Sequence, residues 1–226
     1  MNEIKIGLIL VLLLGLTVGA NYAEASGSKA GNGGHGVLCK SFVQSELLDL
    51  YEAREVYGIV ADYVPFATVE SELSRLQFEL SLILPKDHPF LGLFNEALKL
   101  NETFELTEAG LGFTQDAGFL AGALSADCEL TQIARRVSVG GELSYIIVQK
   151  KDWDWMLSTQ QALLLFHEAA HSWFEYNRTP GELPSTLAAR QIVGALSGSR
   201  DYRLRKAAVL RSIIATRQAA FTSEMR

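Results

Sequence analysis

The chain has 226 residues, 48% of them hydrophobic, and a formal net charge of −6. This mild acidity offers no basic surface for nucleic acid or for an anionic membrane, so we expect neither as a partner. The length is enough for one sizeable hydrophobic core, which predicts a single domain.

Residues 1–25 have the organisation of a secretory signal peptide. Lys5 precedes the uncharged run IGLILVLLLGLTVG, and Ala23-Glu24-Ala25 provides the small residues that a signal peptidase recognises. The apolar run is shorter than the roughly 20 residues that span a bilayer, although a retained N-terminal anchor is the alternative. We therefore expect an exported protein, periplasmic or extracellular, that begins at Ser26 and has no stable membrane insertion after cleavage.

The first residues after the cleavage site are rich in glycine. Residues 26–36 read SGSKAGNGGHG, a composition typical of a flexible segment. We expect His35, which lies within this lead, to be solvated, and we expect residues 37–226 to form the domain. Cleavage removes two acidic residues and one basic residue, which changes the net charge from −6 to −5.

Cys39 and Cys128 are the two cysteines of the chain. In an exported protein such a pair is most simply a disulfide, although two separate buried thiols are the alternative. The bridge would close a loop of about 90 residues, which the chain-entropy model values at roughly 4–5 kcal/mol.

Three segments of the first half have apolar residues at helical spacing, namely 42–63, 69–84 and 90–100. Asp87-His88-Pro89 precedes the third segment, and proline is favoured in a first helical turn. This position favours a capping role for His88 over metal ligation.

The pattern changes in the second half. Gln132–Val139 and Leu143–Lys150 are rich in Ile, Val and Tyr and are separated by Gly140-Gly141, which predicts a β-hairpin. Ser158 and Gln161 have the spacing of a capping box before a helix that continues to Tyr176. Further helices are expected over 185–198 and 201–221. The fold class is therefore mainly α with a small β-hairpin or sheet, an α+β single domain.

The helix expected before Tyr176 contains His167-Glu168-Ala169-Ala170-His171, the HExxH pattern. Residues four apart lie on one helix face, so the two imidazoles can converge on one Zn²⁺. Glu168 then lies beside the metal, where it can take a proton from zinc-bound water. The pattern is expected by chance only about 0.004 times in such a chain, so the motif is specific.

The segment from Leu143 to Asn177, a strand followed by the motif helix ALLLFHEAAHSWF, resembles the active-site segment of zincin metallopeptidases. The resemblance implies that His167 and His171 are zinc ligands and that Glu168 is the catalytic base.

The third zinc ligand is not apparent. The zincin subfamilies would place it at a histidine at position 177 or a glutamate near 190–191, where this chain has Asn177, Arg190 and Gln191. Glu175 lies about 12 Å along the helix from His167, too far for one ion to join both. Asp201 is our first choice, and the other candidates are Glu182 and His88.

A second resemblance covers most of the mature chain. The fragments GNGGHGVLC, LLDLYEAR, CELTQIARR, LLLFHEAAHSW and ARQIVGALSG are similar to an uncharacterised exported protein family of predatory and related bacteria. In that family the second motif histidine is frequently another residue. The resemblance assigns no residue roles and implies a zinc site particular to this chain or none.

Two functions follow from these patterns. The first is an exported zinc-dependent metallopeptidase that hydrolyses a bond in a peptide or protein substrate. The alternative is a non-catalytic exported helical binding or envelope protein. In that case His167 and His171 are structural and form hydrogen bonds with a carboxylate such as Glu168, Glu175 or Asp201.

Overall fold

In the computed structural model the described residues are 29–32, 34–41, 45–65, 67–112, 124–139, 142–177, 185–198 and 210. They form a mixed α+β domain, which confirms the predicted fold class. The predicted signal peptide lies outside these residues, as does the predicted helix over 201–221 except for Leu210, which is helical and buried. Within this part of the chain, no helix combines the length and hydropathy that a membrane span requires.

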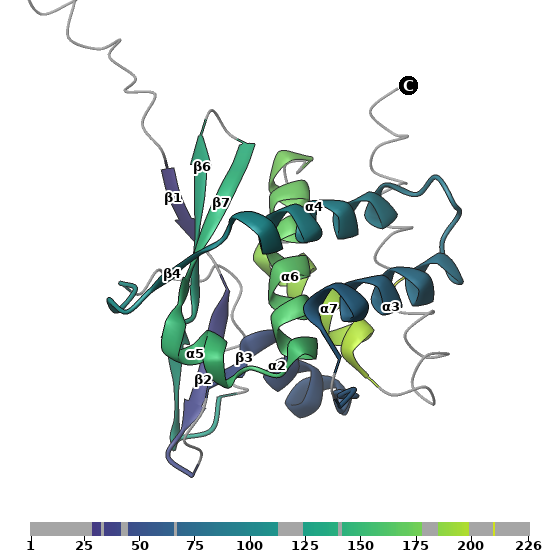
Figure 1. The fold of residues 1–226 in the computed structure, drawn as a ribbon. Coiled ribbons are helices and arrows are strands. Elements are labelled where there is room, and N and C mark those ends of the chain that lie inside the picture. Colours follow the sequence, from purple (N-terminus) through teal and green to yellow (C-terminus); the bar gives the residue numbers. More distant parts are fainter. Residues whose placement is uncertain are drawn as a thin grey trace, which may run out of the picture.

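The described strands form two sheets (Figure 1). The four-stranded sheet has the order β1 (Lys29–Asn32), β6 (Ala134–Val139), β7 (Glu142–Gln149) and β4 (Glu105–Thr107). Its β6 and β7 are antiparallel neighbours, which confirms the predicted hairpin, and β4 runs parallel to β7. The three-stranded antiparallel sheet has the order β3 (Glu46–Leu47), β2 (His35–Cys39) and β5 (Cys128–Gln132).

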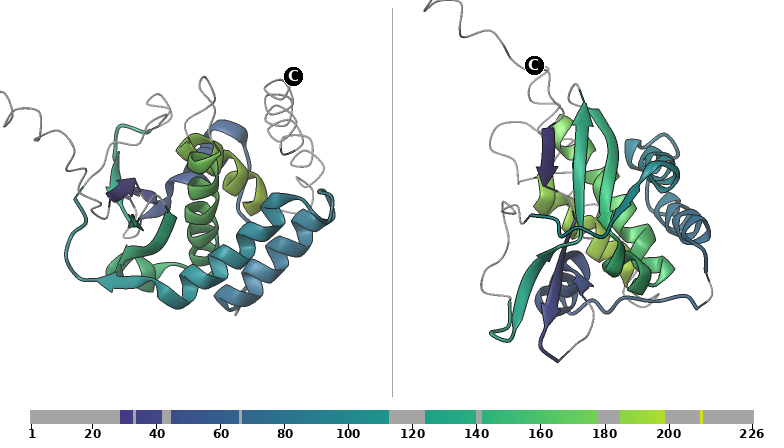
Figure 2. Two further views of the ribbon diagram at one scale, coloured as in Figure 1. Left: turned by 90° about the horizontal axis from the view of Figure 1, so that it is seen from above. Right: turned by 60° about the vertical axis from the view of Figure 1, so that its left-hand side comes forward.

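Two chain segments pass from one sheet into the other at Gly34 and Ile133. The carbonyl of Gly34 accepts hydrogen bonds from the amides of Ile133 and Ala134, at 3.1 and 3.0 Å, and the carbonyl of Ile133 accepts from Gln149 at 2.8 Å. The right-hand view of Figure 2 shows the strands above and below this crossing. Part of the glycine-rich lead therefore forms strands.

Six described helices complete the domain: α2 (Leu48–Tyr57), α3 (Val69–Ser81), α4 (Pro89–Thr103), α5 (Lys150–Trp155), α6 (Ser158–Tyr176) and α7 (Ser185–Ser197). The first is shorter than the pattern predicts, because Glu46 and Leu47 pair with β2 and Gly58 ends the helix with a left-handed φ of 64°. Ahead of α4, Nδ1 of His88 accepts a hydrogen bond from the amide of Phe90 at 3.3 Å. The predicted capping role of His88 is confirmed.

Helix α6 lies in the middle of the domain and packs against α3, α4, α7 and β7 (Figures 1 and 2). The rings of Phe94 and Phe166 stack with their centroids 4.4 Å apart. The side chain of Gln160 accepts from the amide of Leu157 at 3.1 Å, whereas Gln161 donates to the carbonyl of Trp153. The predicted capping box of Ser158 and Gln161 is therefore wrong: the residue before the helix is Leu157, which has no side-chain acceptor, and only the contact from Gln160 back to its amide forms. Most of α6 is buried, as expected of a helix that is apolar nearly all round.

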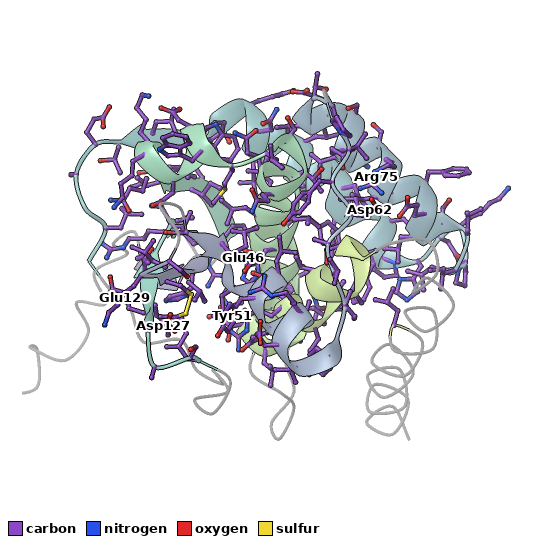
Figure 3. All side chains as sticks on the ribbon, turned by 90° about the horizontal axis from the view of Figure 1, so that it is seen from below. Glu46, Tyr51, Asp62, Arg75, Asp127 and Glu129 are labelled. Atoms are coloured by element: carbon purple, nitrogen blue, oxygen red, sulfur yellow. A yellow bond between two sulfur atoms is a disulfide. The ribbon has the colours of Figure 1, made fainter. Side chains whose placement is uncertain are left out.

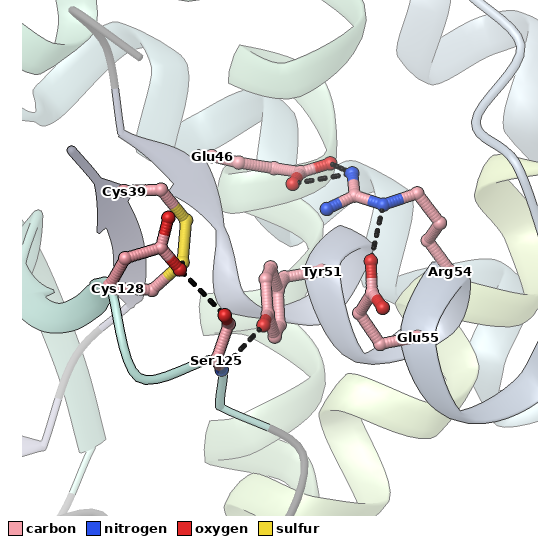
Figure 4. Close-up of a disulfide and its surroundings, with 8 residues drawn as sticks. Cys39, Glu46, Tyr51, Arg54, Glu55, Ser125 and Cys128 are labelled. Atoms are coloured by element: carbon pink, nitrogen blue, oxygen red, sulfur yellow. Dashed lines mark hydrogen bonds and ion pairs between the residues drawn. A yellow bond between two sulfur atoms is a disulfide. The ribbon is translucent and has the colours of Figure 1, made fainter. Parts of the chain in front are cut away.

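Cys39 and Cys128 are directly opposed in β2 and β5 and form a disulfide, as predicted. Close by, the hydroxyl of Tyr51 accepts a hydrogen bond from the amide of Ser125 at 3.1 Å. Figures 3 and 4 show Tyr51 of α2 directed toward the segment that carries Ser125 and Asp127. The disulfide joins β2 to β5 within the three-stranded sheet, and the Tyr51 contact holds the segment before β5 against α2.

Candidate functional site

The HExxH motif occupies the middle of α6, where neighbouring elements cover the helix. His167 is 4% exposed, Glu168 is fully buried and His171 is 3% exposed. Buried polar side chains need partners inside the protein, because water is not available to solvate them. The partners of the motif therefore decide what it can do.

His167 is held by a carboxylate from α2. Its Nδ1 lies 2.6 Å from Oδ1 of Asp49, which is 2% exposed in the first turn of that helix. Burial acts to lower the pKa of His167, but the negative charges of Asp49 and Glu168 outweigh it and the pKa is raised. A carboxylate on Nδ1 also fixes the orientation of the ring, as the outer partner of a metal-bound histidine does.

Glu168 is directed at the crossing of the two sheets. Its Oε1 accepts a hydrogen bond from the amide of Gly34 at 2.5 Å, and its Oε2 has no partner within the described structure. Burial raises the pKa of Glu168. A Cβ at position 34 would lie 2.3 Å from Cδ1 of Leu164 and 3.3 Å from Oε1 of Glu168, so a larger residue there would have to displace the end of the buried Leu164 side chain.

His171 faces a guanidinium from β6. Nη1 of Arg136 lies 2.6 Å from Nδ1 of His171, and Nη2 lies 2.6 Å from Oε2 of Glu175, one turn further along α6. Since a guanidinium only donates hydrogen bonds, Nδ1 accepts, and the proton of the neutral ring is on Nε2. Burial, and then the positive charge of Arg136, hold the pKa of His171 well below its usual value.

A second buried cation, Arg190, lies near enough to the motif to act on its histidines. Nε of Arg190 on α7 donates to Oε2 of Glu52 on α2 at 2.8 Å, and these side chains are 1% and 4% exposed. The charge of Arg190 also acts to lower the pKa of both motif histidines. Position 190, near which one zincin subfamily would have a glutamate ligand, thus holds a cation.

The donor set does not fit a zinc ion in this arrangement. Among the described residues, no group of three or more His, Cys, Asp or Glu side chains is placed to hold a metal. Nδ1 of His171 is engaged by Arg136 and its other nitrogen carries a proton, so neither offers a lone pair to an ion. The predicted ligands His167 and His171 thus have the partners Asp49 and Arg136.

The remaining predicted site residues have different outcomes. Asp201 and Glu182 lie outside the described residues. Glu175 is brought beside His171, with Oε2 3.7 Å from Nε2. The prediction that His35 is solvated is wrong: it is 3% exposed at the start of β2, and its charge contributes to the lowered pKa of His171.

Sequence reasoning missed Asp49, Arg136 and Gly34. Asp49 stands within the apolar run Leu47–Tyr51, and a carboxylate among core positions is a signal that a buried partner exists. Arg136 follows Ala134 by two in a predicted strand and therefore shares its buried face. For Gly34, nothing in the sequence indicated contact with α6.

Comparisons with known proteins give no further assignment. No family model matches the sequence, and no curated protein or solved structure is significantly similar to it.

Proposed function

We propose that this chain is an exported, non-catalytic binding or envelope protein in which the HExxH side chains serve the fold. The observation that carries this proposal is the 2.6 Å contact between Arg136 Nη1 and His171 Nδ1. A metal-bound histidine presents one nitrogen to the metal and donates a hydrogen bond from the other. His171 instead accepts on Nδ1, which is the opposite arrangement.

The position of Glu168 supports the same proposal. A general base must come within hydrogen-bond reach of the water or substrate proton that it abstracts. Glu168 is fully buried, and one of its oxygens is engaged by the backbone of Gly34. This arrangement joins α6 to the crossing of the two sheets. Export is supported by the Cys39–Cys128 disulfide, a feature that persists in oxidising compartments.

A zinc-dependent metallopeptidase is the second candidate, because two observations favour it. Oε2 of Glu168 has no partner among the described residues, and the contact of Asp49 with Nδ1 of His167 is the kind that supports a metal ligand. This function would require His171 to exchange Arg136 for the ion, and a third ligand such as Asp201.

Zinc content of the purified mature protein distinguishes the two functions. We expect well under one equivalent in the wild type after refolding with zinc and dialysis, and no effect of Glu168→Gln on peptide hydrolysis. The second candidate instead predicts about one equivalent that His167→Ala or His171→Ala removes. Glu168→Gln would then keep the zinc and lower hydrolysis by about 10²–10⁴-fold. His88→Ala is the matched control, because this histidine caps α4 and should not change zinc content in either case.

A further inference from the structure

A cluster of exposed apolar side chains lies at the end of α2 and in the segment that follows it. Of the eleven large hydrophobic side chains that are exposed in the described part of the chain, five lie within nine residues there, with exposed fractions of 37–58%. We call this cluster the α2 apolar surface, and its members are Val56, Tyr57, Val60, Tyr63 and Val64. Single exposed apolar residues are ordinary, but a group of them marks a surface at which another chain segment binds.

The surroundings of the α2 apolar surface are acidic. Tyr63 lies close enough to Glu46 for that carboxylate to raise its pKa, and Glu55 and Asp62 belong to the same stretch of chain. Between Glu46 and Asp62 the one basic residue is Arg54, so the exposed charge here is negative on balance. Apolar side chains with a negative rim favour a basic amphipathic segment as the occupant.

The end of the chain has the matching composition. Residues 200–226 hold seven basic and two acidic residues, whereas residues 26–199 hold 12 basic and 22 acidic residues. The two parts therefore have net charges of +5 and −10. Leu210 is helical, fully buried and part of the main core, so the terminal segment starts from a fixed point in the domain. Ile213 and Ile214 follow Leu210 by three and four residues and would share its face of a continuing helix.

The path of the chain leads past the same surface. The amide of Asp62 donates to the carbonyl of Ser197 at 2.7 Å, and Ala61 and Gly198 form an antiparallel bridge at the end of α7. The polypeptide therefore leaves α7 beside the α2 apolar surface. The 16 residues after Leu210 can span about 24 Å as a helix, which is enough to cover a surface of this size.

We propose that residues 211–226 bind the α2 apolar surface of their own chain. In this arrangement Ile213 and Ile214 contact its apolar side chains, and the arginines of the segment face its acidic rim. Binding removes apolar area from water on both sides of the contact and brings opposite charges together. The inference goes beyond the proposed function and does not rest on it, because it concerns a surface outside the HExxH motif.

Labelling of Val60→Cys with a maleimide tests the contact in the full-length mature chain. Bound residues 211–226 shield the thiol, so Val60→Cys should react several-fold more slowly than Val60→Cys/Ile214→Asp. A carboxylate at position 214 would lose its solvation on an apolar surface and therefore releases the segment. Phe78→Cys is the matched control, because Phe78 is 63% exposed on α3 and the thiol should react at the same rate with and without Ile214→Asp.

Equal labelling rates of Val60→Cys with and without Ile214→Asp would overturn the inference. An equal acceleration of Phe78→Cys by Ile214→Asp would also overturn it, because the effect would then be a general loosening of the fold. If Val60→Cys does not fold, Tyr57→Cys takes its place, since Tyr57 is 48% exposed on the same surface.

A second measurement separates the chain's own segment from that of a second copy. Mild oxidation of Val60→Cys/Ile214→Cys should form a new disulfide within one chain, in a yield that does not depend on protein concentration. A covalent dimer whose yield rises with concentration would show that the occupant is a second copy and would contradict the inference.

Discussion

Helix α2 contributes to two ionic regions that differ mainly in burial. At the rim of the domain, Arg54 contacts Glu46 and Glu55 at 2.6 and 2.9 Å, with 39% of the Arg54 side chain exposed (Figure 4). In the interior, Glu52 contacts Arg190 at 2.8 Å with both side chains almost fully buried. Water solvates the first set whether or not the contact forms, whereas the second has lost that solvation and depends on its partner.

The HExxH motif belongs to the buried region. His167, Glu168 and His171 each receive a partner from a different element, namely Asp49 of α2, Gly34 at the sheet crossing and Arg136 of β6. The same side chains that would serve an open metal site therefore connect α6 to the rest of the fold. Burial and partners, rather than the motif alone, therefore decide which role these residues have.

The largest difference between the two regions should appear when one charge is removed from each. Arg190→Met deprives the buried Glu52 carboxylate of its guanidinium and should lower the free energy of unfolding by about 3–5 kcal/mol. Arg54→Met at the rim should lower it by about 1 kcal/mol or less. Urea unfolding of both variants measures the difference. Glu52→Leu/Arg190→Met should recover much of the loss, and equal effects of Arg190→Met and Arg54→Met would contradict the comparison.

The Cys39–Cys128 disulfide joins β2 to β5. Unlike an ion pair, it stabilises the fold by restricting the unfolded chain. Cys39 and Cys128 are 89 residues apart in the sequence. Cys39→Ser/Cys128→Ser should lower the free energy of unfolding by about 2–5 kcal/mol. Reduction of the wild type with dithiothreitol, followed by urea unfolding, should give a similar loss. A loss below about 1 kcal/mol in both cases would show that the three-stranded sheet does not depend on the bridge.

A smaller effect is expected where the backbone of the interior region approaches α6. Gly34→Ala places a Cβ 2.3 Å from Cδ1 of Leu164 and should cost about 1–3 kcal/mol through overpacking. Gly92→Ala in α4 is the matched control, because a Cβ there meets nothing within 4 Å, and it should stabilise the protein by about 0.4–1 kcal/mol. Thermal unfolding of the two variants should therefore shift in opposite directions. A shift in the same direction would disprove the close approach of Gly34.

The smallest effect concerns Tyr63 at the rim. Partial burial, with a contribution from Glu46, raises its pKa to about 12. A phenol that keeps its proton longer in the folded state contributes stability below its unfolded pKa of about 10, and this contribution is lost as the pH rises toward 12. Ultraviolet titration of the wild type should contain a tyrosine step near pH 12 that Tyr63→Phe removes. An unchanged titration curve would exclude this assignment.

Much of the fold could be predicted because local patterns determine it. Apolar spacing located α3, α4 and α6, and the Ile- and Val-rich segments with glycines between them located the β6–β7 hairpin. The start of α2 could not be predicted, because Glu46 and Leu47 have helical spacing in the sequence but pair with β2 in the structure. Pairing with the preceding strand β2 overrides the helical preference there.

The candidate site was predictable only in part. Helical periodicity placed His167 and His171 on one face, but the roles of these side chains depend on Asp49 and Arg136, which are 118 and 35 residues away. No local pattern encodes such pairings. The glycine-rich composition predicted a solvated His35 in a flexible segment. In the structure His35 pairs with Gln132 as part of β2 and β5 and is buried.

The protonation of His171 tests the central claim most directly. Long-range ¹⁵N–¹H NMR of the wild type reports which ring nitrogen carries the proton. We expect an unprotonated Nδ1 and a protonated Nε2, because Arg136 donates to Nδ1. The spectrum should be the same after zinc is added. A protonated Nδ1 with a bare Nε2, or an Nε2 signal that shifts when zinc binds, would contradict that claim.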